Sequence, residues 1–157
     1  MLSTYFSELD MQHTREGHLY TAIVLQIFKL GGLLVSEGDE LTRELGLTSA
    51  RWKVLGALAY SESPMTVSQI AHSMGQTRQG VQRLSDAMVK EGILAYEDNP
   101  HHKKAKLVAM TPKGEDVFQA LERKQIPWAN QNSFDISAQD LDIALDVLRK
   151  MTQKLET

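Results

Sequence analysis

The sequence predicts a mainly α-helical fold with one small β-hairpin, and three observations support this class. Two helical patterns separated by a glycine turn lie within residues 66–90. Two short runs of β-compatible residues, 93–96 and 107–110, follow them. Longer helical patterns occupy both flanks, at residues 15–45 and after residue 111. We therefore expect two central helices and a hairpin, with flanking helices on either side.

The first central helix is predicted to begin just after Thr66. The Thr66 hydroxyl and the Gln69 amide are three residues apart, so each can satisfy a free backbone donor of the other as a capping box. Apolar side chains then recur at helical spacing, at Val67, Ile70 and Ala71. Gly75 permits the left-handed residue that a sharp turn between helices requires.

The second central helix carries the polar residues that best fit nucleic acid. Thr77 is its expected cap, and its buried stripe is Val81, Leu84 and Met88. Its opposite face carries Arg78, Gln79, Gln82 and Arg83. In the major groove, arginine can form two hydrogen bonds with guanine and glutamine two with adenine. We therefore expect Gln79, Gln82 and Arg83 to contact bases, as the first turns of such a helix do.

Two features of this helix have a second explanation. Gly80 lies in a helix interior, where glycine costs about 1 kcal/mol relative to alanine. Close approach to DNA or to the first central helix would account for it. Arginine and glutamine also form helices well on any solvated face, so these side chains taken alone do not indicate DNA. The hairpin that follows them favours the DNA interpretation.

The predicted hairpin has a basic tip. Its loop, residues 97–104, is too long for a two-residue turn and should protrude. No acidic residue lies between Asn99 and Lys106, and the cationic side chains are Lys103, Lys104 and Lys106. Such a tip can pair with DNA phosphates, although a solvated loop with a chance run of charge is the alternative. A helix-turn-helix followed by a basic hairpin is the layout of a winged helix-turn-helix, so double-stranded DNA is the expected partner.

Four fragments carry a resemblance to a known family. They are residues 47–55, 65–71, 77–83, and 105–108 leading into 110–114. In this order and spacing they resemble the MarR (multiple antibiotic resistance regulator) family of transcription factors, over nearly the whole chain beyond about residue 15. The resemblance implies a homodimer that uses the helix from Thr77 in the major groove and a wing around residues 101–104 in the neighbouring minor groove. Thr66 and Ser68, at the start of the first central helix, are further expected DNA contacts.

The predicted wing departs from the family pattern at two positions. His102 stands where the family usually has an aspartate, and Lys104 stands where it has an arginine. Lysine lacks the planar guanidinium that suits a narrow minor groove, so we expect phosphate contact there. His101 and His102 also motivate a hypothesis: DNA affinity should rise as the pH falls toward ~6.5, the ordinary histidine pKa. An affinity that stayed flat between mildly acidic and neutral pH would exclude it.

Composition limits the class of protein. A chain of 157 residues with 42% hydrophobic residues and a net charge of −3 fits one domain. We predict a single domain over residues 1–157, with an N-terminal dimerisation helix at 15–46, a DNA-binding lobe at 48–111 and C-terminal dimerisation helices at 112–157. The absence of cysteine excludes a disulfide scaffold and thiol-based oxidation sensing. No apolar run approaches the ~20 residues of a membrane span and no secretory signal is visible, so we expect a cytoplasmic protein with no membrane partner.

The N-terminal flanking helix should run over residues 15–45 and end at Gly46, a typical C-cap. One face of it carries Leu19, Ile23, Ile27, Leu30 and Leu34. Gly31 and Gly32 interrupt the pattern, which indicates either a kink or the close approach of another helix. Thr48 then caps a helix whose apolar positions are Trp52, Leu55 and Leu58, and a loop at Ser63 and Pro64 ends it.

Two helices are predicted after the hairpin. Thr111 and Pro112 are a cap and a first-turn proline, and Pro127 should kink or end the helix that they start. Ser137 and Asp140 open the last helix, whose apolar stripe is Leu141, Ala144, Leu145, Leu148, Met151 and Leu155. Apolar stripes on both terminal helices indicate an interface, which the family resemblance assigns to a second copy. A two-fold dimer would require a pseudo-palindromic operator, with recognition helices about 34 Å apart.

The family resemblance also implies a small organic effector, commonly anionic or aromatic, between the dimerisation helices and the DNA-binding lobe. His18, Tyr20 and Trp52 are the expected lining residues, although a tryptophan at helical spacing is more often part of a core. We expect no resident cofactor. A ligand that prefers a dimer with wrongly spaced recognition helices would relieve repression by its differential affinity.

Three other classes of protein remain as alternatives. A metal sensor is disfavoured because the five histidines show no paired ligand spacing, so no metal site is expected. An enzyme is disfavoured because the chain has no phosphate-binding glycine loop, no cysteine nucleophile and no recognisable Ser-His-acid set. A winged helix that only docks to proteins is the main alternative to a DNA-binding regulator, because a fold does not dictate its partner.

Overall fold

The computed structural model describes residues 12–156, so residues 1–11 and 157 of the predicted single domain lie outside the described residues. Its N-terminal half contains α1 (Arg15–Thr42), the 3-10 turn η1 (Arg43–Leu45), α2 (Ser49–Ala59), β1 (Met65–Thr66) and α3 (Val67–Ser73). The second half contains α4 (Arg78–Lys90), β2 (Leu94–Glu97), β3 (Leu107–Met110), α5 (Pro112–Asn132) and α6 (Ala138–Leu155). The predicted mainly α-helical class is confirmed.

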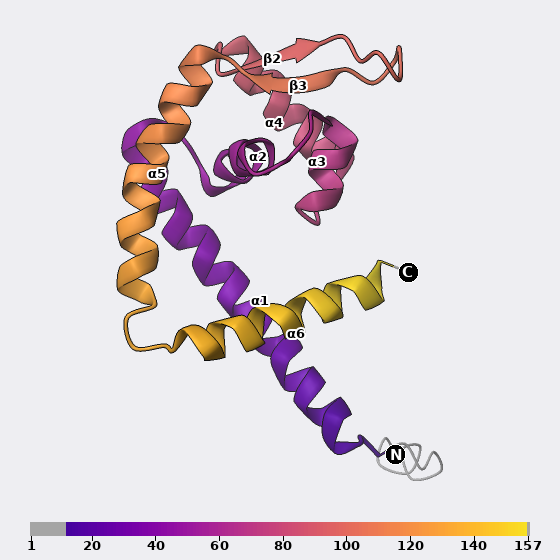
Figure 1. Ribbon diagram of the computed structural model, residues 1–157, viewed down its shortest axis with the longest axis vertical. Helices are drawn as coiled ribbons and strands as arrows, with labels where there is room; N and C mark the ends of the chain where they lie inside the picture. The colour runs from indigo at the N-terminus through magenta and orange to yellow at the C-terminus, as the bar shows by residue number, and fades with distance from the viewer. Residues whose placement is uncertain (1–11, 157) are drawn as a thin grey trace, which may run out of the picture.

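A lobe made of α2, α3, α4 and the strands lies at one end of the molecule (Figure 1). Helix α5 runs away from this lobe along one side, and α1 and α6 extend beyond it. The hairpin loop between β2 and β3 projects from the lobe. The predicted winged helix-turn-helix with flanking helices is therefore present.

The predicted helix caps are confirmed because each depends on residues close in sequence. The side chains of Thr48, Thr66, Thr77, Thr111 and Ser137 each accept a hydrogen bond from a backbone N–H three residues later. Thr66 and Gln69 form the complete capping box. Gly46 and Gly75 have φ values of 66° and 59°, the left-handed conformation expected of them.

The hydrophobic core lies inside the lobe. Its fully buried apolar side chains are Val54, Leu55, Ile70, Val81, Met88, Leu94 and Leu121. Trp52, Leu58 and Leu84 are partly buried and pack against this cluster. The core thus joins α2, α3, α4, α5 and the sheet, and it fixes α4, the second helix of the helix-turn-helix, relative to the hairpin.

The sheet has three antiparallel strands in the order β1-β3-β2. The predicted runs 93–96 and 107–110 appear as Leu94–Glu97 and Leu107–Met110, a shift of one residue at β2. Strand β1 was not predicted, because two residues are too few to show a strand period. Met65 pairs with Val108 and Thr66 with Leu107, so the start of α3 is attached to the hairpin.

The structure narrows three local expectations at glycine and proline residues. Helix α1 runs without a break through Gly31 and Gly32, and no described atom lies within 4 Å of a β-carbon built on either. Within the chain, a β-carbon at Gly80 would meet only the Thr77 cap hydroxyl, at 3.0 Å, so close approach to the first central helix does not explain this glycine. Pro127 does not end its helix, because α5 continues to Asn132. A proline removes only one internal hydrogen bond, and the next turn is anchored where Trp128 Nε1 donates to Glu37 at 3.3 Å.

Residues 15–45 pass a length and composition test for a membrane span, with a mean hydropathy of 1.7 in the best window. The expectation that no apolar stretch approaches that length was therefore wrong. Scattered polar residues interrupt the apolar runs of α1 but barely lower its average hydropathy. A helix that packs in the core of a soluble protein has the same composition, so this property alone does not place α1 in a membrane.

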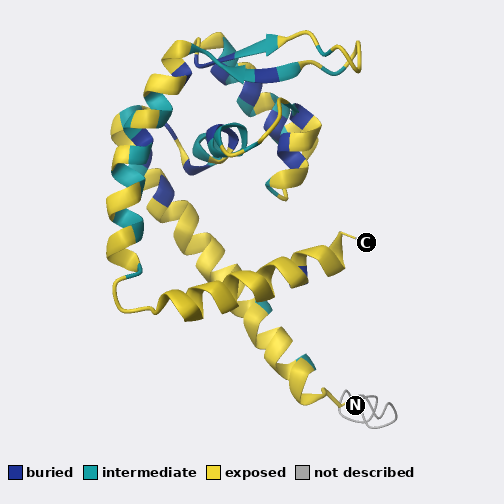
Figure 2. Ribbon diagram, viewed as in Figure 1, coloured by how far each residue is buried: buried dark blue, intermediate teal, exposed yellow. Residues whose placement is uncertain are grey.

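The terminal helices expose apolar side chains of the types that are buried in the lobe. Helices α1 and α6 are almost entirely exposed, whereas the buried residues concentrate in the lobe (Figure 2). The exposed fraction is 71% at Phe28, 53% at Leu19 and 45% at Leu145. Met151 is the buried member of the predicted α6 stripe, at 8%.

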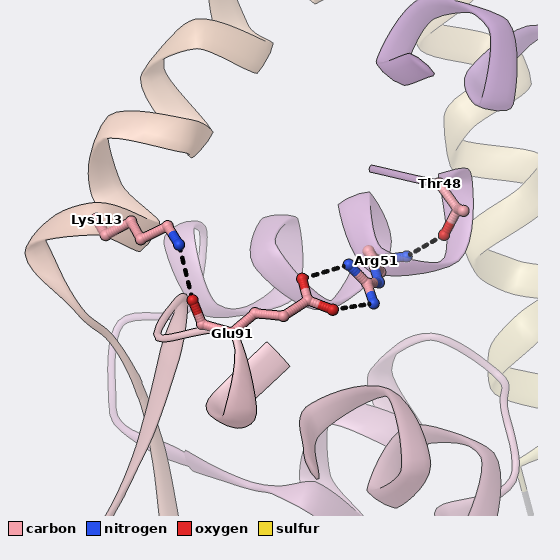
Figure 3. A network of polar contacts seen from close by, with 4 residues as sticks. All are labelled: Thr48, Arg51, Glu91 and Lys113. Carbon is pink, nitrogen blue, oxygen red and sulfur yellow. Dashed lines mark hydrogen bonds and ion pairs between the residues drawn. The ribbon is translucent and has the colours of Figure 1, made fainter. Parts of the chain in front are cut away.

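A polar network joins the ends of α2, α4 and α5 (Figure 3). Arg51 forms a two-pronged ion pair with the carboxylate of Glu91, with N–O distances of 2.7 and 2.8 Å. Lys113 Nζ donates to the backbone carbonyl of Glu91 at 2.8 Å. The Arg51 guanidinium holds the pKa of the Glu91 carboxyl below its usual range. Helix α4 is thereby held at its C-terminal end, while its N-terminal end stays free to contact a partner.

Candidate nucleic-acid interface

The recognition helix α4 presents three unpaired polar side chains at its N-terminal end. Arg78, Gln79 and Arg83 are exposed. Among the described residues none of these side chains has a hydrogen-bond or ion-pair partner. Thr77 is also exposed, and its hydroxyl oxygen accepts from Gly80 N at 3.1 Å, which leaves the hydroxyl hydrogen free to donate. The first turns of α4 therefore offer donors to a phosphate or a base edge.

Gln82, the remaining predicted contact on α4, is already engaged. Its amide nitrogen Nε2 donates to Asp86 Oδ1 and to the Tyr96 hydroxyl oxygen, both at 2.9 Å. The Tyr96 hydroxyl donates in turn to Asp86 Oδ1 at 2.5 Å. Asp86 lies one turn further along α4 and Tyr96 lies on β2, so these bonds connect the recognition helix to the wing.

The wing loop is ordered by hydrogen bonds among its own residues. Asn99 Oδ1 accepts from His101 N at 3.0 Å, and the Asn99 carbonyl accepts from His102 N at 3.2 Å. The His102 carbonyl accepts from Ala105 N at 3.2 Å. These turns leave the four predicted tip residues exposed: His101, His102, Lys103 and Lys104. The tip can therefore meet a polyanion without rearranging its own hydrogen bonds.

Lys106 differs from the other wing lysines because it already has an acidic partner. Its Nζ lies 2.5 Å from Asp98 Oδ1, and the lysine holds the pKa of the Asp98 carboxyl below its usual range. Asp98 lies just outside the stretch in which the sequence shows no acid, and it reaches Lys106 across the hairpin. Lys103 and Lys104 are thus the wing cations that have no acidic partner among the described residues.

A cavity of about 210 Å³ brings several predicted contacts together. It lies between the start of α3, the start of α4 and the wing, and its wall includes Thr66, Ser68, Arg78, Gln82, Lys104 and Lys106. Thr77, Gln79, Arg83, His101, His102 and Lys103 do not line it. Sequence reasoning missed Tyr96, which also lines this cavity, because a tyrosine in a β-compatible run was taken only as a strand residue. We call this set of walls the interface groove.

A larger cavity of about 890 Å³ lies between α1, α2, α5 and the end of α3. Trp52 lines it, as predicted, together with Lys53 and Trp128. His18 and Tyr20 do not line it, because they lie near the start of α1, well before its first lining residue, Gly31. Trp128 was missed because the walls come from several elements that are far apart in the sequence.

The described residues contain no group of three or more histidine, aspartate or glutamate side chains that could hold a metal ion. His13 and His18 lie with their rings 6.3 Å apart, and His72 Nε2 lies 3.7 Å from Glu156 Oε1. Neither pair is part of the interface groove.

A helix-turn-helix with a free cationic N-terminal end on its second helix, next to a protruding basic hairpin, defines a winged helix-turn-helix protein. The model of the MarR family matches residues 45–105, which cover the lobe up to the wing. An uncharacterized protein of Mycobacterium bovis, Mb2034c, is 34% identical over 134 residues, with 85% of this chain and 92% of that protein covered. This chain therefore belongs to the MarR family of transcriptional regulators.

Two further comparisons define what the chain is similar to. The transcriptional activatory protein BadR of Rhodopseudomonas palustris is 25% identical over 141 residues, with 88% of this chain and 81% of BadR covered. The crystal structure of CouR from Rhodococcus jostii RHA1, bound to p-coumaroyl-CoA, superposes with a TM-score of 0.74 and 17% identity. It covers 83% of this chain and 91% of CouR. At 17% identity, the similarity to CouR concerns the fold alone.

Proposed function

We propose that this chain acts in the cytoplasm as a homodimeric repressor that binds a pseudo-palindromic site in double-stranded DNA through α4 and the wing. The observation that carries this proposal is the placement of unpaired donors. Arg78, Gln79 and Arg83 start the recognition helix, and Lys103 and Lys104 form the tip of the neighbouring wing. Cations with no intramolecular partner need not give up an ion pair to contact phosphate.

The proposed dimer rests on the apolar faces of α1 and α6. Leu19, Phe28 and Leu145 are at least 45% exposed in a single chain. Exposed apolar surfaces of this extent mark interfaces in soluble proteins. A two-fold partner on α1 and α6 would bury them and set two copies of α4 on successive turns of the major groove, about 34 Å apart.

The proposed effector site is the cavity of about 890 Å³ between α1, α2, α5 and the end of α3. Its wall offers the rings of Trp52 and Trp128 and the cation of Lys53, which suits a small organic anion with an apolar body. The structure of CouR, whose fold is similar, contains p-coumaroyl-CoA, so a neighbour of this fold binds an organic ligand. Because α1 and α5 belong to the flanks and α2 to the lobe, a ligand between them can change the spacing of the recognition helices by population shift.

Binding-site selection from random duplexes, followed by a salt titration on the selected site, tests the proposal. We expect an inverted repeat that is bound by a dimer, with affinity that falls steeply as salt rises. Arg83→Ala should lose about 1 to 3 kcal/mol of discrimination at one base pair. Lys103→Ala with Lys104→Ala should weaken binding to all sequences and reduce the slope of log affinity against log salt by about 2.

Lys90→Ala is the matched control, since Lys90 lies at the opposite end of α4 and should not affect DNA binding. Failure to enrich any sequence at low salt, with the protein folded and dimeric, would instead favour a module that docks to other proteins. Repression is tested by transcription in vitro from a promoter that contains the selected site. Increased transcription, as the name of BadR describes for that relative, would overturn the repressor part alone.

A further inference from the structure

We propose that Asp86 and Tyr96 make Gln82 an acceptor-only contact in the major groove, so that it selects a base carrying an amino group, cytosine or adenine, over guanine or thymine. This inference rests on the proposed DNA binding. It changes what the sequence alone predicted for Gln82, which was a two-bond contact with adenine. A two-bond contact needs one donor and one acceptor from the glutamine amide.

Both donor hydrogens of the Gln82 amide are used within the chain. Nε2 carries two hydrogens, and it has two acceptors at 2.9 Å, Asp86 Oδ1 and the Tyr96 hydroxyl oxygen. No described residue donates to the other amide atom, Oε1. Gln82 lines the interface groove, so the carbonyl oxygen is the atom left to meet a base.

Asp86 fixes which way the amide faces. An ionised carboxylate only accepts hydrogen bonds, so turning the amide over would place Oε1 against Asp86 Oδ1 without a hydrogen between them. The Tyr96 hydroxyl gives its own hydrogen to Asp86 at 2.5 Å, and it can therefore only accept from Gln82. Each of the three groups thus determines the orientation of the next.

The sheet and the lobe hold this network in place. Tyr96 is half-buried, and it pairs with Val108 in the register of β2 and β3. Burial and the Asp86 carboxylate raise the pKa of Tyr96, while the Tyr96 hydroxyl lowers the pKa of Asp86. The pair therefore keeps its phenol and carboxylate forms over the ordinary pH range. The side chain of Gln82 is already held in one rotamer before DNA binds, which lowers the entropic cost of binding.

The chemistry of base edges then predicts the preference. In the major groove, cytosine offers its N4 amino group and adenine its N6 amino group, whereas the edges of guanine and thymine offer only acceptors. A lone carbonyl oxygen can bond the first two and is repelled by the others. Gln79 is exposed and has no hydrogen-bond partner among the described residues, so both the donor and the acceptor of its amide stay available. It serves as the internal comparison.

Binding-site selection with the full-length protein and four variants tests the inference. Gln82→Ala should erase a preference for cytosine or adenine at one position of each half-site and leave the other positions unchanged. Asp86→Ala and Tyr96→Phe should free amide hydrogens of Gln82 and move that position from cytosine-or-adenine toward adenine, by about fivefold or more. Gln79→Ala, the matched control, should alter a different position. A wild-type preference for guanine or thymine at the Gln82 position, or an unchanged profile in Asp86→Ala, would overturn the inference.

A measurement without DNA separates this inference from the proposed function. In an NMR spectrum of the free protein, the side-chain amide resonances of Gln82 should shift on Tyr96→Phe and move toward those of an exposed glutamine on Asp86→Ala. Resonances that do not respond to either change would overturn the inference whatever the DNA result. Responsive resonances in a protein that enriches no DNA sequence would instead count against the proposed function.

Discussion

The DNA-binding lobe and the two terminal helices place their apolar side chains in opposite ways. In the lobe, Leu55, Ile70 and Met88 are completely buried by contacts within one chain. On α1 and α6, side chains of the same kind, such as Phe28 at 71% and Leu155 at 80%, face outward. The lobe buries its own hydrophobic surface, whereas the terminal helices leave theirs exposed in a single chain. The difference separates what one chain buries alone from what the proposed homodimer would have to bury.

The strongest way to break the lobe is to crowd its junction with α5. A β-carbon at Gly114 would lie 2.1 Å from the carbonyl oxygen of Ile93, a contact that backbone atoms cannot relieve locally. We expect Gly114→Ala to lower the free energy of unfolding by about 3 kcal/mol or more. Denaturant unfolding followed by circular dichroism measures this.

Gly56→Ala is the control for that prediction, because no described atom lies within 4 Å of its β-carbon position in α2. It should be neutral or stabilise the protein by up to about 1 kcal/mol. Equal stability of the two variants would mean that the backbone at Ile93, just before β2, can move away from the start of α5. The lobe would then be less tightly packed than its buried core indicates.

The second change concerns the terminal helices. Leu145→Asp places a charge in the apolar stripe of α6, where the leucine is 45% exposed in one chain. We expect the dissociation constant of the dimer to rise at least about tenfold, while the lobe stays folded. Light scattering across a concentration series measures the first effect, and the circular dichroism spectrum the second.

Gln139→Glu introduces a charge at an exposed polar position of the same helix and should leave the dimer intact. If Leu145→Asp left the protein dimeric at the lowest concentrations, α6 would lie outside the interface. The exposed stripe would then need a different explanation.

The third change tests how α2 is joined to the C-terminal end of α4 within the lobe. Glu91 has its pKa depressed by Arg51, so the ion pair adds stability above the ordinary glutamate pKa, and this stability is lost as the pH falls through the lower pKa of the folded protein. Arg51→Ala should therefore lower the melting temperature at neutral pH and have less effect at strongly acidic pH. Melting curves of both proteins at several pH values measure this. Parallel curves at all pH values would show that the pair does not contribute.

The same contrast explains how much could be predicted from sequence. Helix caps such as Thr48, Thr77 and Ser137 were predicted correctly because each depends on a backbone N–H three residues away. The predicted hairpin was shifted by one residue, and β1 was missed, because Met65 and Thr66 become a strand only by pairing with β3. A helix cap can be predicted because its residues are close in the sequence, whereas the pairing of distant strands cannot be seen in the local pattern.

The candidate site follows the same rule. The types of residue on α4 and the wing could be predicted, since base and phosphate contacts use few kinds of side chain. Their partners could not: Gln82 meets Tyr96 across two elements, Lys106 meets Asp98 across the hairpin, and the larger cavity joins Trp52 to Trp128. Only the folded chain shows which predicted contacts are free and which are occupied.

The smallest expected effect distinguishes the two interpretations of the glycine pair in α1. Within one chain the helix is unbroken at Gly31, and a β-carbon there would meet no described atom within 4 Å. Gly31 faces the large cavity, which has room for a methyl group. We therefore expect Gly31→Ala to raise the free energy of unfolding by about 0.5 to 1 kcal/mol, through the lower backbone entropy of the unfolded chain. Denaturant unfolding at a concentration where the dimer persists measures it. A loss of similar size would mean that another helix packs against Gly31 in the assembly, because only a neighbour absent from the single chain could turn that methyl group into a clash.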